Sequence, residues 1–427
     1  MKRTLIKEVV KKEGKSVTIK GRVVNTRNLG KLVFLVISDY TGTIQVVLEG
    51  KFDIKPGDIV SINGVVKKEP RAECGYEVSG EKVDVICGIV EDLPIDLTKN
   101  DLNLNINTLL DKRTLSLRHE KIQAIFRLYD ILLKSYETAM RKEDFVEIKT
   151  PKILGAATEG GSNFFKVDYF KKEATLAQSP QLYKQIMVGV FERVFEIGSV
   201  FRAEPHFTTR HVCEYVGIDG EMGFIDDFHD VTKLLNKVLV DIFETIRKEG
   251  APYLKFYEVE PPEVPTEIPH FKLAEIKEII KKEYDYTVPE DTDIDPQGER
   301  LAGRYVKEKL NSDFVFLTHY PWKERPFYTM PDKDNPKETC GFDLLYKGLE
   351  IATGGQRINE YHQLIDNMEK RGVNPKGLEF YLDVFKYGMP PHGGWGMGSE
   401  RIIQQMLNLK SIKEASLFPR DVNRITP

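Results

Sequence analysis

Apolar and polar residues alternate along much of the first quarter of the chain. Between residues 16 and 90, segments such as SVTIKGRVVN and GTIQVVLEG place β-branched or other apolar side chains at every second position. This alternation is typical of strands that bury one face, and Gly30 and Gly42 mark turns between successive strands. The pattern predicts five short strands that close into a small β-barrel, although a small sandwich would show the same alternation.

The rest of the chain follows other patterns. Apolar residues recur at helical spacing between residues 119 and 143, where one face carries Ile122, Ile125, Tyr129 and Leu132. Beyond this helix, strand and helix patterns mix without a βαβ rhythm, which favours an α+β fold with an antiparallel sheet flanked by helices. We therefore expect a barrel of the oligonucleotide-binding (OB) fold at residues 1–93, a polar hinge at 94–112 and a larger domain at 113–427.

Composition narrows the class of protein. The chain has 427 residues, of which 41% are hydrophobic and 30% charged, and a net charge of -4, as expected for a soluble globular protein without a global basic surface. Any nucleic-acid surface must therefore be local. The four cysteines form no C-x-x-C pair, so a zinc cluster or a disulfide framework is not expected, and scattered thiols fit the cytoplasm. No apolar run is long enough to cross a membrane.

A dense charged stretch, GSVFRAEPHFTTRHVCEYVGIDGEM, covers residues 198–222 between two strand-like segments. An exposed hairpin tip is the common explanation for such charge. However, Arg202, Glu204, Asp219 and Glu221 lie in or beside the strands, and alternation places them on one sheet face. Burying an unpaired charge is costly, so such a face suits a zwitterionic or polyphosphate ligand.

Three further segments carry candidate chemistry. ATEGGSNFF (156–164) contains Glu159, and AQSPQLYKQIM (177–187) predicts a helix that begins near Pro180 and carries Gln181 and Lys184 on one face. At the C-terminus, GLEIATGGQRI precedes YGMPPHGGWGMGSERIIQQML, which predicts a glycine-rich loop that leads into a helix. Such a loop lets backbone approach phosphate. Each segment alone is a weak signal.

In this order, the four segments resemble the class II aminoacyl-tRNA synthetases, and more closely the short archaeal and eukaryotic aspartyl-tRNA synthetases. FVEIKTPKI resembles motif one, which forms the dimer, FRAE…TTRH…EY resembles motif two, and GMGSER resembles motif three. The resemblance covers essentially the whole chain. It implies that residues 113–427 form a class II catalytic domain and that the barrel binds the anticodon.

The resemblance also implies an ATP site with Mg²⁺. Catalysis would rest on Arg202, Glu350 and Arg401, without a protein nucleophile. Mg²⁺ would be held by Glu350 and Thr353, with Asp343 as a further ligand. The family usually has Ser where Thr353 stands. The implied ATP-binding residues are Arg202, Glu204, Arg210, His211, Val212, Tyr215, Glu350, Gly398, Ser399, Glu400 and Arg401.

For the amino acid, the resemblance indicates L-aspartate. Lys184 stands where asparaginyl enzymes carry an apolar residue, and Arg357 would bind the side-chain carboxylate of the substrate. Glu159 would close over the substrate. The full set implied for aspartate is Glu159, Ser179, Gln181, Lys184, Arg202, Asp219, Thr353 and Arg357.

The implied RNA partner is tRNA(Asp). In the barrel, Phe34 would stack on an anticodon base, and Arg27, Gln45 and Glu77 would contact base edges or backbone. Phe34 lies in KLVFLVIS, which is apolar throughout, so a core position would fit equally well. Archaeal enzymes that read only the aspartate anticodon tend to have Trp at the place of Val24, so the chain is also expected to accept tRNA(Asn).

Other functions remain open at this point. An asparaginyl-tRNA synthetase shares most of these motifs, but Lys184 argues against it. A ligase that acts without tRNA would usually lack the barrel. A non-catalytic RNA-binding paralogue would be expected to lose motif residues that are present here. The favoured interpretation is a cytoplasmic homodimer that uses ATP as a co-substrate and has no membrane partner.

Overall fold

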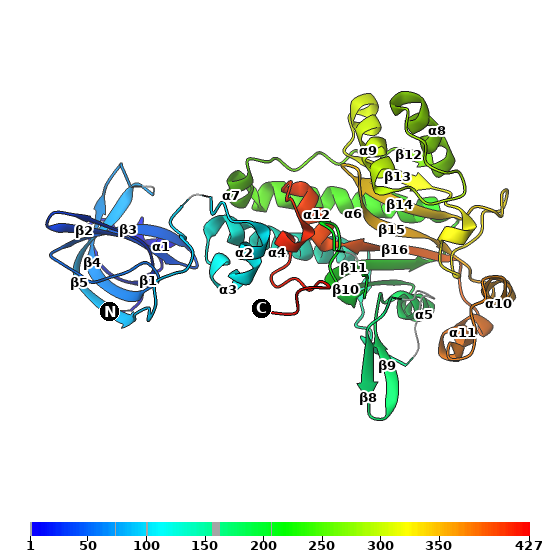
Figure 1. Ribbon diagram of the computed structural model, residues 1–427, viewed down its shortest axis with the longest axis horizontal. Helices are drawn as coiled ribbons and strands as arrows, with labels where there is room; N and C mark the ends of the chain where they lie inside the picture. The colour runs from blue at the N-terminus through cyan, green and yellow to red at the C-terminus, as the bar shows by residue number, and fades with distance from the viewer. Residues whose placement is uncertain (1, 73, 100, 156–162, 206) are drawn as a thin grey trace. The chain divides into compact units, whose positions relative to one another are not determined.

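The computed structural model describes residues 2–72, 74–99, 101–155, 163–205 and 207–427. The chain divides into two compact units, residues 1–119 and 120–427. The segment 94–112, expected as a hinge, contains helix α2 (Ile106–Asp111), and α3 (Arg113–Ser116) follows it in the first unit. Figure 1 shows the strands of the small barrel in the first unit and the large sheet with its helices in the second.

The first unit is built on a closed five-stranded barrel, as predicted. Its strands join in the order β1-β2-β3-β5-β4. Alternate residues such as Val33, Leu35 and Ile37 point into the barrel and are buried, which is why the alternating pattern predicted these strands. The elements are α1 (Ile6–Val9), β1 (Ser16–Leu29), β2 (Leu32–Asp39), β3 (Gly42–Glu49), β4 (Ile59–Lys68) and β5 (Tyr76–Cys87).

The second unit contains an eight-stranded sheet in the order β12-β13-β14-β15-β16-β11-β10-β6. Its six central strands are antiparallel, as predicted, but each edge strand is parallel to its neighbour, so the sheet is mixed. The strands are β6 (Val146–Glu147), β10 (Arg193–Phe201), β11 (Glu214–Gly223), β12 (His270–Lys272), β13 (Phe314–Thr318), β14 (Gly341–Tyr346), β15 (Leu349–Arg357) and β16 (His392–Gly398).

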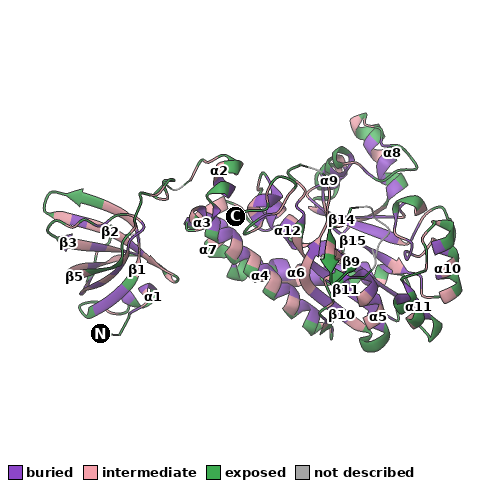
Figure 2. Cartoon of the chain, turned by 60° about the horizontal axis from the view of Figure 1, so that its bottom comes forward, coloured by how far each residue is buried: buried purple, intermediate pink, exposed green. Residues whose placement is uncertain are grey.

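Helices cover this sheet. The predicted helix at 119–143 is α4 (Glu120–Lys142), which packs beside α6 (Phe228–Glu249), and both are buried along one side and exposed along the other (Figure 2). Their apolar faces join the sheet in one large core. The other helices are α5 (Gln181–Phe191), α7 (Ala251–Leu254), α8 (Leu273–Tyr284), α9 (Pro296–Leu310), α10 (Tyr361–Lys370), α11 (Glu379–Lys386) and α12 (Ser399–Met406), with short 3-10 turns at Lys255–Tyr257, Trp322–Glu324 and Ile412–Ala415.

Two segments differ from the sequence-based expectation. The glycine-rich segment before α12 is a central strand, β16, and not a loop, because its glycines allow a very close approach to β11. A Cβ on Gly394 would lie 2.1 Å from the carbonyl oxygen of Gly220. The segment FVEIKTPKI forms two short strands in different sheets, since β6 joins the large sheet while β7 (Ile153–Leu154) pairs with the hairpin of β8 (Lys166–Tyr169) and β9 (Lys172–Leu176).

Candidate active site

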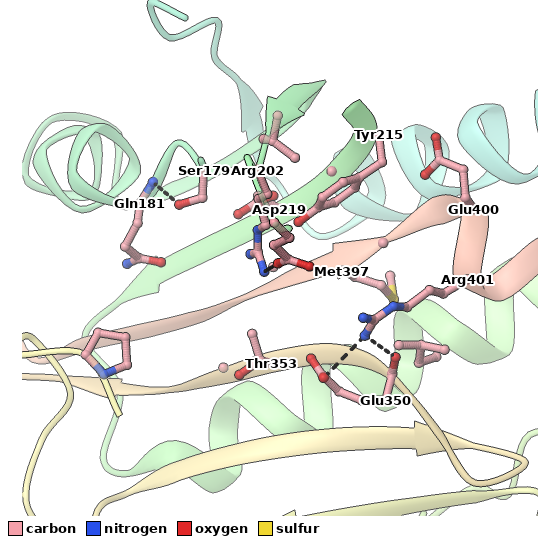
Figure 3. A pocket seen from close by; sticks show the side chains of 18 of the residues that line it. Ser179, Gln181, Arg202, Tyr215, Asp219, Glu350, Thr353, Met397, Glu400 and Arg401 are labelled. Atoms are coloured by element: carbon pink, nitrogen blue, oxygen red, sulfur yellow. Dashed lines mark hydrogen bonds and ion pairs between the residues drawn. The ribbon is translucent and has the colours of Figure 1, made fainter. Parts of the chain in front are cut away.

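A pocket of about 160 Å³ opens on the polar face of the central strands of the second unit. Figure 3 shows Ser179 and Gln181 at one end, Glu350 and Arg401 at the other, and Asp219 between them. The lining residues are Ser179, Gln181, Val200, Arg202, Glu204, Arg210, His211, Val212, Tyr215, Gly217, Asp219, Arg325, Pro326, Tyr328, Thr329, Glu350, Ile351, Thr353, Gly354, Arg357, Gly396, Met397, Gly398, Glu400, Arg401 and Ile412.

Strand β11 supplies the middle of the pocket by simple alternation. Tyr215, Gly217 and Asp219 line the cavity, whereas Ile218 belongs to the apolar core on the opposite face. Glu221 continues the polar row and is fully buried. The predicted single charged face of this hairpin is therefore confirmed for β11.

Strand β15 reaches the pocket through a β-bulge. Ala352 pairs with Leu344 and Glu350 with Leu345, so Ile351 is an extra residue without a partner. In a regular strand Glu350 and Thr353 would point to opposite faces, because they are three positions apart. The extra residue brings both side chains to the same face of the sheet, and both line the pocket.

One end of the pocket is a closed network of buried charges. Lys184 Nζ lies 2.9 Å from Asp219 Oδ2, 3.3 Å from Glu221 Oε2 and 2.7 Å from the carbonyl oxygen of Trp395. Arg357 donates from Nε to Glu221 Oε1 at 2.9 Å. The Lys184 side chain is only 2% exposed and that of Glu221 is 0% exposed. Lys184 itself is not part of the cavity wall.

The charges in this network balance in pairs. Burial acts to raise the pKa of Glu221, but the positive charges of Arg357 and Lys184 outweigh it and hold that pKa below its usual value. For Asp219 burial dominates and raises the pKa, although Lys184 opposes the shift. Two cations thus face two carboxylates in a site that excludes most water.

The opposite end of the pocket is more open. Arg401 donates from Nη1 to the carbonyl oxygen of Glu350 at 2.7 Å, and the same atom lies 3.2 Å from Glu350 Oε2. Burial acts to raise the pKa of Glu350, but the nearby charges of Arg401, Arg325 and Arg202 lower it overall. The side chains of Arg202 and Glu350 are 39% and 31% exposed.

Glu204 and Tyr215 flank Arg202 at the open end. Arg202 Nη1 lies 3.9 Å from Glu204 Oε1, and the guanidinium carbon is 5.6 Å from the centre of the Tyr215 ring. His211 Nε2 approaches the same carboxylate at 3.5 Å. Cationic, acidic and aromatic groups therefore meet here; their binding of ATP, which the resemblance implied, stays a prediction.

Helix α9 contributes a residue that the sequence analysis missed. Glu299 forms an ion pair with Arg210, and burial raises the pKa of Glu299 to about 7. The two residues lie 89 positions apart, so no local pattern connects them. Arg210 lines the cavity, whereas Glu299 lies behind it, off the cavity wall.

A second missed residue, Arg325, engages a predicted metal ligand. Its Nη1 and Nη2 lie 2.9 and 2.8 Å from the two carboxylate oxygens of Asp343, and Nη1 also donates to Thr353 Oγ1 at 2.7 Å. Arg325 lines the cavity, but Asp343 does not. Pairing with a guanidinium leaves this carboxylate directed at an arginine and not at the pocket.

Three further predicted site residues, Glu400, Ser399 and Glu159, differ in where they lie. Glu400 lines the cavity, but its carboxylate accepts from the backbone nitrogen of Val216 at 3.0 Å and from the Tyr129 hydroxyl at 3.0 Å, which ties α12 to β11 and α4. Ser399 is buried beside it, off the cavity wall, and donates to the Val216 carbonyl oxygen. Glu159 lies outside the described residues.

In the barrel, the four predicted anticodon residues share the outer surface. Phe34 pairs with Arg27 across β1 and β2, and Gln45 pairs with Glu77 across β3 and β5. Gln45 Nε2 donates to Glu77 Oε2 at 3.0 Å. Phe34 is half-buried and lies outside the barrel core, so the alternative of a core phenylalanine is not what the fold shows.

Two negative findings apply to the described ranges alone. Within them, no group of three or more His, Cys, Asp or Glu residues could hold a metal ion by itself. Among the helices of the same ranges, none has the length and apolar character needed to cross a membrane.

The comparisons with known proteins agree with this geometry. Residues 105–422 match the family described as tRNA synthetases class II (D, K and N), and residues 17–86 match the OB-fold nucleic acid binding domain. The aspartate–tRNA(Asp/Asn) ligase of Deinococcus radiodurans is 43% identical over 100% of this chain and 99% of its own length. The chain belongs to the class II aspartyl-tRNA synthetases.

Other synthetases extend the comparison. The aspartate–tRNA(Asp/Asn) ligase of Thermus thermophilus is 41% identical over the full length of both chains, and the aspartate–tRNA(Asp) ligase of Thermococcus kodakarensis is 40% identical over 97% of each. Among solved structures, the asparaginyl-tRNA synthetase of Pyrococcus horikoshii with asparaginyl-adenylate gives a TM-score of 0.91 at 29% identity and covers 100% of both chains. The aspartyl-tRNA synthetase of Entamoeba histolytica gives 0.87 at 29% identity, covering 100% of this chain and 93% of its own.

The family assignment confirms the resemblance drawn from the sequence, whereas the roles of single residues stay predictions. Aspartyl and asparaginyl synthetases share this fold at similar TM-scores. The fold alone therefore does not select the amino acid. That choice must come from the side chains at the closed end of the pocket.

Proposed function

We propose that this synthetase activates L-aspartate with ATP and transfers it to the 3′ end of tRNA(Asp) and also of tRNA(Asn). Full-length relatives at about 40% identity carry the names of aspartate–tRNA ligases, some for both tRNAs and some for tRNA(Asp). The observation that carries the proposal is the closed end of the pocket, where Lys184 and Arg357 lie among two buried carboxylates.

Charge balance favours aspartate over asparagine. The substrate ammonium would lie against Asp219, near Ser179 and Gln181. Lys184 and Arg357 then face one remaining carboxylate, Glu221, which leaves one positive charge for the substrate side chain. Aspartate supplies the matching negative charge, whereas asparagine would leave a buried charge unpaired at a cost of roughly 2–5 kcal/mol.

The open end supports phosphate chemistry. The α-carboxylate of the substrate would attack the α-phosphorus of ATP, with Arg202 placed to neutralise charge on both, and Arg401 and Arg210 placed for the more distant phosphates. Tyr215 offers an aromatic face for adenine. Catalysis would thus rest on positioning and electrostatics, because no protein nucleophile is required.

Glu350 fits a magnesium site. Mg²⁺ prefers one or two carboxylates together with substrate phosphates and water, and the half-buried Glu350 carboxylate and the Thr353 hydroxyl line the same cavity. When bound, the ion would neutralise charge on the phosphates. Asp343, held by Arg325, would have to exchange its partner to become a ligand.

The decisive experiment is ATP–pyrophosphate exchange without tRNA, followed by charging of purified tRNA(Asp) and tRNA(Asn). We expect exchange with aspartate and not with asparagine, and charging of both tRNAs. Asparagine-dependent exchange would support an asparaginyl enzyme, and no exchange at all would support a non-catalytic RNA-binding protein. Charging of tRNA(Asp) alone would contradict the proposal for tRNA(Asn).

The barrel should carry the tRNA step. Phe34→Ala should reduce charging about 5- to 150-fold, because stacking on one base contributes roughly 1–3 kcal/mol and 1.4 kcal/mol is a factor of ten. Amino-acid activation should not change, since its pocket lies wholly in the second unit. Normal charging by a folded variant would exclude Phe34 as an anticodon contact.

We further propose a homodimer in the cytoplasm. The α4–β6 segment resembles the motif that forms an isologous two-fold interface in this class. All four cysteines are free thiols, which suits a reducing compartment. A fully active monomer at nanomolar concentration would argue against the dimer.

A further inference from the structure

A row of buried polar side chains lies behind the closed end of the pocket. Gln185 and His392 are each 0% exposed, Tyr381 is likewise 0% exposed, and Gln181 alone among these four reaches the cavity wall. Buried polar groups are costly unless each donor meets an acceptor. The direction of every hydrogen bond in the row can therefore be worked out.

The donor and acceptor roles along the row are fixed first at His392. Its Nδ1 lies 2.9 Å from the carbonyl oxygen of Pro390, which can only accept, so Nδ1 carries the hydrogen. Burial lowers the pKa of His392 to about 4, and the ring is neutral near pH 7. Its Nε2 must then accept, and the partner at 2.9 Å is the side-chain nitrogen of Gln185.

The acceptor role of His392 Nε2 in turn fixes the orientation of the two side-chain amides, those of Gln185 and Gln181. With its nitrogen on His392, Gln185 turns its oxygen the other way, where it accepts from Gln181 Nε2 at 3.1 Å and from the Tyr381 hydroxyl at 3.3 Å. Gln181 consequently directs its own oxygen at Arg357, whose Nη2 lies 3.3 Å away. A reversed Gln181 amide would set a donor against a donor.

We propose that Gln185 and His392 are positioning residues for the amino-acid site: they hold the Gln181 amide with its oxygen toward Arg357 and the pocket. An oxygen there can accept from the substrate ammonium, and it steadies the arginine that meets the substrate side chain. This inference rests on the proposed function of the pocket. It gives a functional role to Gln185 and His392, neither of which lines the cavity.

The test compares variants of the full-length enzyme in ATP–pyrophosphate exchange. Gln185→Met removes both polar atoms at similar volume and should raise KM for aspartate roughly tenfold or more, with KM for ATP unchanged. His392→Met should behave in the same way. His392→Gln, whose amide oxygen can still accept, should recover most of the loss. Tyr381→Phe is the matched control and should change KM less than about threefold, because the bond from Gln181 to Gln185 remains.

Several results would overturn the positioning role. An unchanged KM for aspartate in folded Gln185→Met would do so, as would equal behaviour of His392→Met and His392→Gln. Equal losses for aspartate and ATP would indicate a purely structural role. If the wild type activates asparagine instead, the proposed substrate is wrong, and the same variants then decide the positioning role through KM for asparagine.

Nitrogen NMR of the wild-type enzyme reports which ring nitrogen of His392 carries hydrogen, independently of any activity measurement. The His392 signal is assigned by its loss in His392→Gln. The inference requires a neutral ring with hydrogen on Nδ1, and hydrogen on Nε2 would contradict it.

Discussion

The two ends of the pocket differ in how far their charged side chains are buried and how closely they are paired. At the closed end the side chains of Lys184, Arg357 and Glu221 are 2%, 5% and 0% exposed, and their contacts lie near 3 Å. At the open end, the side chains of Arg202 and His211 are 39% and 30% exposed and approach Glu204 at 3.9 and 3.5 Å. The closed end is fixed before substrate arrives, while the open end leaves its cations accessible.

This contrast suits two different tasks. Selecting aspartate from a near-isosteric amide requires buried charges that cannot be screened by water. Binding a triphosphate requires several cations that can adjust as charge moves during the reaction. Substitutions at the closed end should therefore act on selectivity and stability together, whereas a residue such as Arg401, proposed to contact only the phosphates, should act mainly on ATP.

The largest effect is expected from Lys184→Leu. It would leave Asp219 and Glu221 without their shared cation in a buried site, which typically destabilises a protein by about 3–5 kcal/mol. Aspartate-dependent exchange should be abolished, while ATP binding measured by calorimetry should persist in the folded fraction. Unchanged aspartate activation in that variant would remove Lys184 from the amino-acid site.

An intermediate effect is expected from Arg401→Lys at the open end. The variant keeps the charge but loses the planar guanidinium, whose Nη1 contacts both the carbonyl oxygen and the carboxylate of Glu350 and whose other nitrogens stay available for phosphate. KM for ATP should rise on the order of tenfold, with KM for aspartate and the melting temperature nearly unchanged. A comparable rise for aspartate would show that the two ends are not independent.

The smallest effect is expected from Glu299→Gln. Releasing Arg210 from its ion pair should lower KM for ATP about two- to fivefold, because the freed guanidinium could then contact phosphate, and a tenfold change corresponds to about 1.4 kcal/mol. Arg300→Gln on the exposed side of the same helix is the control. An unchanged KM for ATP would mean that the pair does not compete with phosphate.

Glu299 also gives a pH test with a defined sign. Its pKa is about 7 in the folded chain against an ordinary value of 4.5, so the folded state binds more protons than the unfolded state between these pH values. The stabilising effect of the protonated group is present below pH 4.5 and is lost as pH rises through 7. The melting temperature should therefore fall more steeply between pH 5 and pH 8 for the wild type than for Glu299→Gln.

Sequence patterns predicted the elements that have a regular period. Alternation located the five barrel strands and the polar row on β11, and helical spacing located α4 to within one residue at each end. The pattern failed for β16, because glycines carry no side chain and so show no period. The expected loop is instead a strand that packs so closely that a Cβ on Gly394 would meet Gly220.

The candidate site was predictable where residues lie in motif-like segments. Arg202, Asp219, Glu350 and Arg401 all reach the cavity, but their roles came from resemblance. Arg325 and Glu299 were missed because their partners lie 18 and 89 positions away in the chain. Long-range pairing of this kind leaves no local trace, and it also explains why Asp343 is directed at an arginine.

Because of the bulge at Ile351, one continuous strand, β15, supplies side chains to both ends of the pocket. Glu350 at its start lies at the open end of the pocket, and Arg357 at its finish lies at the closed end, with β14 and β16 paired to the strand on either side. The distance along the pocket between Glu350 and Arg357 is therefore set by the pairing of β15 with its two neighbours and not by a loop. If the proposed roles of these two residues are right, we expect glutamate, one methylene longer than aspartate, to be rejected, because β15 is paired on both sides and cannot shift to make room.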